Sequence, residues 1–89
     1  RWATYGRAIE VYRRGLELYP HRQPWRNNLA RRYAFLERYD EALVEFERLI
    51  AEGTRFAGTY SAAADVYAAL GRRETGYRVL SELAARQAE

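Results

Sequence analysis

An internal period of 34 residues is the feature that most constrains what this sequence can fold into. Shifting the chain by one period superimposes small residues on small ones and large apolar residues on large ones, without a gap. The matched sets are Ala8, Ala42 and Gly76; Tyr12, Phe46 and Leu80; Ala30 and Ala64; and Tyr33 and Tyr67. Such periods are typical of repeat proteins, in which each unit buries its apolar face against its neighbours. The sequence therefore predicts a stack of similar units within one small domain.

Five segments have apolar residues at helical spacing, and no segment shows the alternation that a half-buried strand requires. They span residues 5–18, 24–36, 40–52, 58–70 and 74–87. Pro24 suits the first turn of a helix, and Gly53 and Gly71 suit left-handed C-terminal caps. Short turns between helices of similar length make neighbouring helices antiparallel. We expect an all-α domain of five helices arranged in antiparallel pairs.

Short motifs within the period resemble the tetratricopeptide repeat. The stretch "LARRY" carries Leu29, Ala30 and Tyr33, "AAADVY" carries Ala63, Ala64 and Tyr67, and "ALVEF" carries Ala42 and Phe46. The family has a helix–turn–helix unit of this length with small and aromatic residues in this order. The resemblance implies a right-handed superhelical solenoid, in which the first helix of each pair lines a concave groove. It also implies binding of a peptide or protein segment without chemistry, so the chain is expected to be a scaffold and not an enzyme.

The period divides the sequence unevenly. Residues 23–56 and 57–89 each fill a whole unit, whereas residues 1–22 fill only the second half of one. Because the sequence starts at Arg1 and contains no Met, we expect this single domain to be a fragment of a longer chain. The stripe of Ala8, Tyr12 and Leu16 would then face a helix that is absent.

The resemblance points to candidate groove residues on the first helices and the linkers. They are Arg22, Asn27, Asn28, Arg31, Phe35, Arg55, Ser61 and Asp65. Amides bind a peptide backbone, a guanidinium pairs with a carboxylate, and an exposed aromatic ring anchors a ligand side chain. The alternatives are that the polar residues are only solvated and that Phe35 packs against the neighbouring repeat. Gly58 and Ala62 stand where the family's clamp for a C-terminal carboxylate has basic residues, so no such clamp is expected.

Both ends of the stack are candidate surfaces for self-association, because the terminal units of a solenoid need a polar outer face. The candidates are Tyr5, Ala8 and Tyr12 at one end, and Tyr77 and Leu80 at the other. We therefore expect an oligomer that forms with rising protein concentration through an end of the stack.

The distribution of charge raises a second class of partner. All 15 basic residues are arginine, and residues 1–39 carry nine of them against three acidic residues. Arginine pairs well with phosphate, and Trp25, Tyr33 and Phe35 lie among these arginines as candidate stacking platforms for bases. The alternative is therefore an RNA-binding helical-repeat module. The net charge of only +3 favours a protein or peptide partner over nucleic acid.

Catalytic and metal-binding chemistry find no support in the sequence. There is no cysteine, and His21 is the single histidine. This excludes disulfides, thiol catalysis and cysteine-ligated metal sites, and no catalytic residue, metal or cofactor is expected. No apolar run approaches the roughly 18 residues of a membrane span, and no signal peptide is recognisable. A cytoplasmic location is expected.

Overall fold

The computed structural model describes the backbone of residues 2–88 and the side chains of residues 6–88. This part of the chain forms five α-helices and no strand. They are α1 (Trp2–Leu18), α2 (Gln23–Phe35), α3 (Tyr39–Ala51), α4 (Ala57–Ala69) and α5 (Arg73–Gln87). All five predicted helices are confirmed; α2 to α5 each begin one residue earlier than expected, and α1 begins three residues earlier.

The observed helices follow the sequence period. Both ends of α2 lie 34 residues before the corresponding ends of α4, and α3 begins 34 residues before α5. The α2–α3 and α4–α5 hairpins are therefore equivalent units, and α1 takes the place of a second helix. The regular spacing arises because the same small, aromatic and turn-forming positions recur in each unit.

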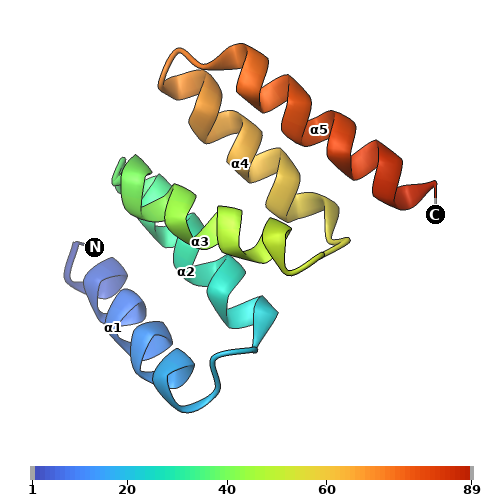
Figure 1. Ribbon diagram of the computed structural model, residues 1–89. Coiled ribbons are helices and arrows are strands. Elements are labelled where there is room, and N and C mark those ends of the chain that lie inside the picture. Colours follow the sequence, from blue (N-terminus) through green and yellow to red (C-terminus); the bar gives the residue numbers. More distant parts are fainter. Residues whose placement is uncertain (1, 89) are drawn as a thin grey trace.

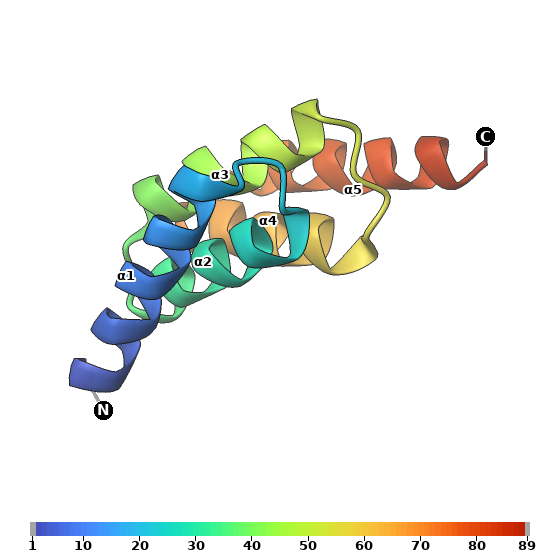
Figure 2. The same cartoon turned by 90° about the horizontal axis from the view of Figure 1, so that it is seen from below.

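The helices form two layers (Figures 1 and 2). α2 packs against α1 and α3, α4 packs against α3 and α5, and α2 also touches α4. Among the described helices, α3 does not pack against α1 or α5. In Figure 2, α3 and α5 lie on one side of the molecule, and α2 and α4 lie on the other. This packing is compatible with an α solenoid whose first helices form one continuous surface.

Three helices end in the same hydrogen-bonded turn. Glu37, Gly53 and Gly71 adopt positive φ angles of 59°, 85° and 76°. In each turn, this residue donates its N–H to the carbonyl three positions back, and the next residue donates to the carbonyl five positions back. This is the Schellman motif, in which glycine is favoured because it has no Cβ. The predicted caps at Gly53 and Gly71 are confirmed, and Glu37 adopts the same conformation with a side chain.

The core lies where consecutive helices cross. Ala30, Ala42, Phe46 and Ala63 are fully buried there. Small residues at the crossings let the helices approach closely, and aromatic side chains fill the adjacent space. At Gly76, a Cβ would lie 3.2 Å from the carbonyl oxygen of Ala64, so the backbones of α4 and α5 nearly touch. The small residues of the sequence period therefore set the distances between helices.

A second recurring contact ties each linker to the helix that follows it. Arg26 and its equivalent Tyr60 are both buried in the fourth position of their helices. The Arg26 guanidinium donates to the carbonyl of Pro20 at 2.9 Å, and the Tyr60 hydroxyl donates to the carbonyl of Thr54 at 2.6 Å. Because Pro20 and Thr54 are also one period apart, two different side chains satisfy the same linker carbonyl.

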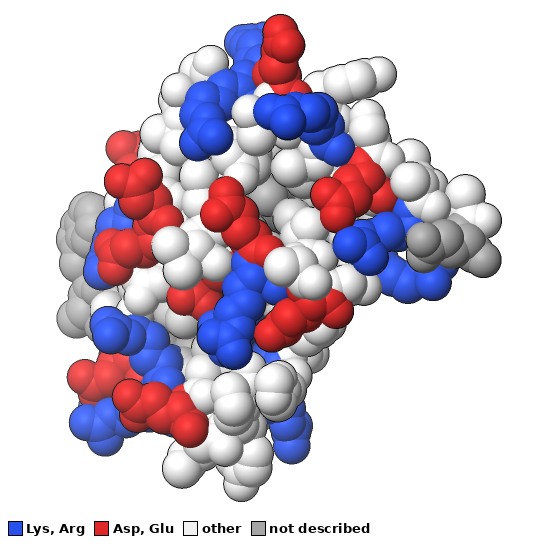
Figure 3. Space-filling model, viewed as in Figure 1, with Lys and Arg blue, Asp and Glu red and all other residues white. Residues whose placement is uncertain are grey.

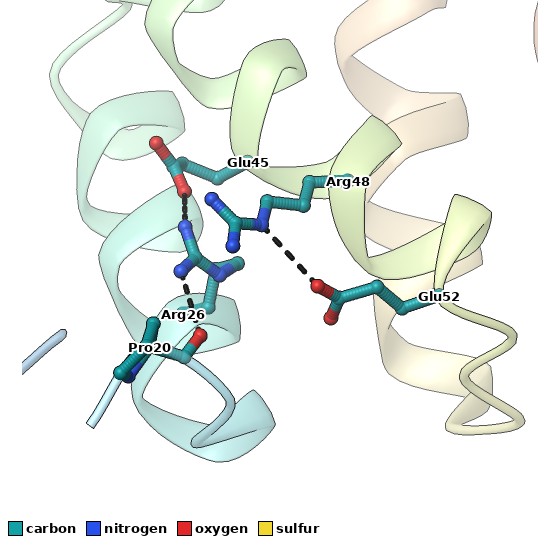
Figure 4. Close-up of polar contacts among 5 residues, drawn as sticks. All are labelled: Pro20, Arg26, Glu45, Arg48 and Glu52. Atoms are coloured by element: carbon teal, nitrogen blue, oxygen red, sulfur yellow. Dashed lines mark hydrogen bonds and ion pairs between the residues drawn. The ribbon is translucent and has the colours of Figure 1, made fainter.

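Arg26 also bridges to α3. Its Nη1 donates to Glu45 Oε1 at 2.5 Å, in an ion pair that is largely shielded from solvent (Figure 4). The same view shows Arg48 paired with Glu52 one helical turn further along, at 3.3 Å. Removing one partner from a buried pair leaves the other charge uncompensated, so Arg26 and Glu45 depend on each other.

The expectation that Ala8, Tyr12 and Leu16 face an absent helix is wrong for two of the three residues. Leu16 is buried in the core together with Ile9, and Tyr12 packs against the same core. Tyr12 also accepts a hydrogen bond from Asn28 Nδ2 at 3.3 Å. The physical reason is that α1 presents a broad apolar face to α2, which buries Leu16 and partly buries Tyr12 and Ala8.

Candidate peptide-binding surface

A pocket of about 400 Å³ opens at the start of α2, against the linker to α4. It is lined by Gln23, Pro24, Asn27, Asn28 and Arg31 from α2, by Leu49 from α3, and by Thr54, Phe56 and Thr59. Its volume falls in the range that binds small ligands or single side chains in proteins. The lining combines an apolar floor with amide and guanidinium groups at its edge.

Phe56 forms a wall of this pocket because the first turn of α4 carries a glycine. A Cβ at Gly58 would lie only 2.7 Å from the Phe56 ring, which is closer than real contacts allow. The ring therefore rests over Gly58 and remains more than half exposed. An alanine at position 58 would require the exposed Phe56 ring to shift from this position, a role of Gly58 that the sequence did not reveal.

A second, shallower pocket of about 340 Å³ lies between α2 and α4. It is lined by Arg31, Ala34, Phe35, Tyr39, Ala62, Asp65, Val66 and Ala69. Arg31 lines both pockets, so the two hollows adjoin along one face of α2. Five of the groove residues that were proposed from the sequence line these hollows: Asn27, Asn28, Arg31 and Phe35 on α2, and Asp65 on α4.

Arg31 is exposed and has no hydrogen bond or ion pair with the described residues. Asp65 lines the same pocket but forms no ion pair with it. Two opposite charges that are close but unpaired in an open pocket both remain available to a ligand.

The two asparagines differ in how much of each amide remains available. Asn27 is buried, and its Oδ1 accepts a hydrogen bond from the Thr59 hydroxyl at 2.8 Å. This bond joins the equivalent turns of α2 and α4, so Asn27 mainly fixes the spacing between the two units. Asn28 is half-buried and donates to Tyr12, which leaves its carbonyl oxygen as a free acceptor at the pocket edge. Of the two, Asn28 is the better candidate for a ligand contact.

Three candidate groove residues do not line these pockets. The Arg22 guanidinium stacks on Trp25 and Tyr19, with its central carbon 5.0 and 5.4 Å from the two ring centres. Arg55 donates to the main-chain carbonyl of Arg86 at 2.5 Å, and so ties the linker to the end of α5. Ser61 is exposed and lies outside both pockets. Their roles in binding stay predictions.

Groups with a shifted pKa lie away from the two pockets on α2 and α4. Burial, together with a hydrogen bond to Glu47, raises the pKa of Tyr67 to about 12. A paired hydrogen bond to Arg38 lowers the pKa of Glu41, and burial raises the pKa of Tyr60. None of these residues lines either pocket. Each of these shifts arises from burial or from a hydrogen bond between side chains of the fold.

The opposite side of the molecule has a mixed-charge surface. Figure 3, with α3 towards the viewer, shows arginine and acidic side chains interspersed over this side. Several are paired within one helix, such as Arg48 with Glu52 and Arg86 with Glu82. A surface of alternating sign is typical of a solvated face.

The two candidate surfaces for self-association differ in exposure. At the first end, the Tyr5 side chain lies outside the described residues, and Ala8 and Tyr12 are half-buried. At the other end, Tyr77 and Leu80 are exposed on α5. Among the candidates whose side chains are described, those on α5 are therefore the more exposed.

Comparison with known proteins adds no relative: no family model, no curated protein and no solved structure matches the chain. Within residues 2–88, no helix has the length and apolar character needed to cross a membrane. The described side chains also include no group of three or more histidine, aspartate or glutamate residues that is placed to hold a metal ion. The pockets on α2 and α4 are therefore the features on which a function is argued.

Proposed function

We propose that this chain is a tetratricopeptide-like, right-handed helical repeat that binds an extended peptide segment across α2 and α4, without catalysis. The observation that carries the proposal is the pair of adjoining pockets that share the unpaired Arg31. Supporting it, the first helices of the two units touch and face the same side of the molecule. The resemblance of the repeat motifs assigns ligand binding to this side.

The size of the surface matches a short peptide. From Pro24 to Phe35, α2 rises about 16 Å, which an extended chain covers in roughly five residues. An apolar side chain fits the pocket walled by Phe56, and a second fits the hollow beside Phe35. Between them, Arg31 is placed to pair with a carboxylate, in a charge-assisted contact.

Peptide display on the immobilised domain tests this proposal. We expect enriched peptides to carry two apolar residues on either side of an acidic one. Arg31→Glu should weaken binding of these peptides at least tenfold, because it places a like charge beside the acidic residue. Gly58→Ala should weaken the same peptides by displacing Phe56 from the pocket wall.

Arg7→Glu is the matched control, because Arg7 is an exposed arginine of α1 outside both pockets. It changes net charge by the same amount and should leave peptide affinity unchanged. If Arg7→Glu weakened binding as much as Arg31→Glu, only bulk charge would matter and the assigned surface would be wrong. Circular dichroism establishes that each variant keeps its helices.

One observation favours RNA as a second candidate: α2 contains arginines and no acidic residue. Phe35 is an exposed aromatic ring on the same helix and fits base stacking. Titration with single-stranded RNA at two salt concentrations separates the candidates, because phosphate contacts weaken steeply as salt rises. Binding of RNA that is lost on Arg31→Glu and at higher salt would favour this candidate over the peptide. No binding at low salt would exclude it.

A further inference from the structure

Helix α5 presents an apolar stripe that no other described helix covers. Tyr77 is 73% exposed, Leu80 is 42% exposed, and Ala84 is also exposed. Their spacing of three and four residues places them on one face. Gly76 and Val79, on the adjacent face, are the residues that pack towards α4.

The repeat itself shows that this stripe is of a kind that helices cover. One period earlier, Leu43 and Phe46 occupy the positions of Tyr77 and Leu80 on α3. They are 6% and 0% exposed, because α3 packs between α2 and α4. Ile9, another period earlier, is 5% exposed in the same core. The corresponding face of α5 therefore has the composition of a helix interface without a covering helix in the structure.

The side chains of the stripe decrease in size along α5, so two stripes that run in opposite directions are complementary in shape. Tyr77 is large, Leu80 is intermediate, and Ala84 is small. If two copies of α5 pack antiparallel about an axis near Leu80 and Ser81, Tyr77 of each lies over Ala84 of the other. The large side chain of each copy then packs against the small one of the other, so that no space is left empty at either end of the contact.

The charges at the helix ends favour the same arrangement. Arg73 begins α5, where the helix dipole is positive and a cation is unfavourable. In an antiparallel pair, each Arg73 lies beside the negative C-terminal turn of the partner helix. The contact therefore gives Arg73 a favourable electrostatic neighbour, while Glu74 complements the positive first turn of α5 within each copy.

The exposed face of α1 is a poorer match. Its exposed apolar residues Val11 and Leu18 alternate with Arg7 and Arg14 along the same helical face. Pairing α1 with α5 would bring these arginines against the apolar stripe. Pairing α5 with α5 of a second copy avoids this, and gives a closed two-fold dimer, which is the commonest form of homo-oligomer.

We infer that α5 is the interface of a weak homodimer, in which the Tyr77–Leu80–Ala84 stripes of two copies pack antiparallel. The contact is distinct from the peptide pockets on α2 and α4. Two domains joined in this way would present two peptide-binding surfaces in one assembly.

Sedimentation equilibrium of the 89-residue chain over a concentration series tests the dimer. We expect a reversible monomer–dimer equilibrium, and Leu80→Glu should raise its dissociation constant at least tenfold. The matched control is Val44→Glu, which adds the same charge at an exposed valine of α3 and should leave the dimer unchanged. A chain that stays monomeric at millimolar concentration would overturn the inference, as would equal weakening by both variants.

Cysteine cross-linking tests the antiparallel geometry, and the chain has no native cysteine to interfere. Tyr77→Cys and Ala84→Cys variants, mixed and oxidised, should form the mixed disulfide in preference to either symmetric one. Preferential cross-linking of Tyr77→Cys with itself would contradict the proposed register. Arg73→Glu provides a further test, since it should stabilise the monomer at the helix N-terminus and weaken the dimer several-fold.

Discussion

At the scale of single residues, Glu37 is the position where the sequence conflicts most clearly with the backbone. It has a φ of 59° in the turn where the equivalent unit has Gly71. The left-handed conformation costs about 1–2 kcal/mol for a residue with a side chain. Glycine avoids this cost, but part of the benefit is lost because glycine has more conformational entropy in the unfolded chain. We predict that Glu37→Gly raises the free energy of unfolding by about 0.5–1 kcal/mol, measured by urea denaturation.

Two alanine substitutions serve as controls for the Glu37 prediction. Gly71→Ala places a side chain on the same left-handed backbone and should lower stability by about 1 kcal/mol. Gly6→Ala lies in α1 with open space around the added carbon, and should raise stability by a similar amount. If both alanine substitutions changed stability in the same direction, backbone conformation would not be the cause of the Glu37 effect.

Tyr67 gives a pH dependence with a defined sign. Its pKa is raised to about 12 in the folded chain, chiefly by burial, from an ordinary value of about 10. Folding therefore favours the neutral phenol. The resulting contribution to the free energy of unfolding is complete below pH 10 and is lost as the pH rises towards 12. We predict that stability falls by about 1–2 kcal/mol over this interval, and less in Tyr67→Phe.

Urea denaturation at pH 8 and pH 11 measures the Tyr67 effect. Tyr77→Phe is the matched control for the loss of one phenol, because Tyr77 is exposed on α5. A pH response of Tyr67→Phe as steep as that of Tyr77→Phe would contradict the assignment. Tyr60 contributes with the same sign, because burial also raises its pKa, so some pH dependence should remain in both variants.

Residue roles that depend on contacts between elements were the hardest to predict. The sequence shows an arginine at position 26, but not that Glu45, 19 residues away, pairs with it. Likewise, Asn27 reads as a groove amide, whereas Thr59 in the next unit engages it. The 34-residue period does relate Arg26 to Tyr60, and the structure shows that both are buried. The hydrogen-bond partner of each in the preceding linker could not be read from spacing alone.

At the scale of helices, the sequence predicted more, because the signals that start and end a helix are local. Pro24 and the glycine caps fixed the helix ends to within one residue. The exception is the start of α1, where no proline or capping residue marks the boundary and the helix extends further than expected. The burial of Leu16 was missed for a different reason, since periodicity shows that a face is apolar but not which neighbour covers it.

The contact between α4 and α5 depends on Gly76. A side chain there would meet the backbone of Ala64, which has no freedom to rotate away. We predict that Gly76→Leu lowers the free energy of unfolding by about 2–3 kcal/mol, because overpacking forces the two helices apart. Thermal unfolding followed by circular dichroism measures the change.

The control for Gly76 is a leucine placed elsewhere on the same helix. Ser81→Leu adds a comparable side chain at an exposed position of α5 and should change stability by less than about 0.5 kcal/mol. Unchanged stability in Gly76→Leu would mean that α5 packs on α4 less closely than the backbone distance indicates.

At the scale of the whole molecule, the repeat arrangement makes stability a sum of contacts between neighbouring helices. α2 and α3 each pack against helices on both sides, whereas α1 packs only on α2 and α5 only on α4. Gly76 is the single buried residue of α5, while the buried residues of α3 include Ala42, Leu43 and Phe46. The domain should therefore open from its ends inwards.

Hydrogen exchange followed by mass spectrometry tests this order. We predict that backbone amides of α2 and α3 are the slowest to exchange, and that those of α5 exchange at least tenfold faster, which corresponds to about 1.4 kcal/mol in opening free energy. The experiment uses Leu80→Glu, so that dimer formation through α5 does not protect the terminal helix. Equal protection of all five helices would show that the domain unfolds as one cooperative unit and would contradict the prediction. We expect the amides of α5 to become protected at high concentration in the unmodified chain but not in Leu80→Glu. Such a difference would show that α5 is covered by a second copy, because the domain itself leaves these amides open to exchange.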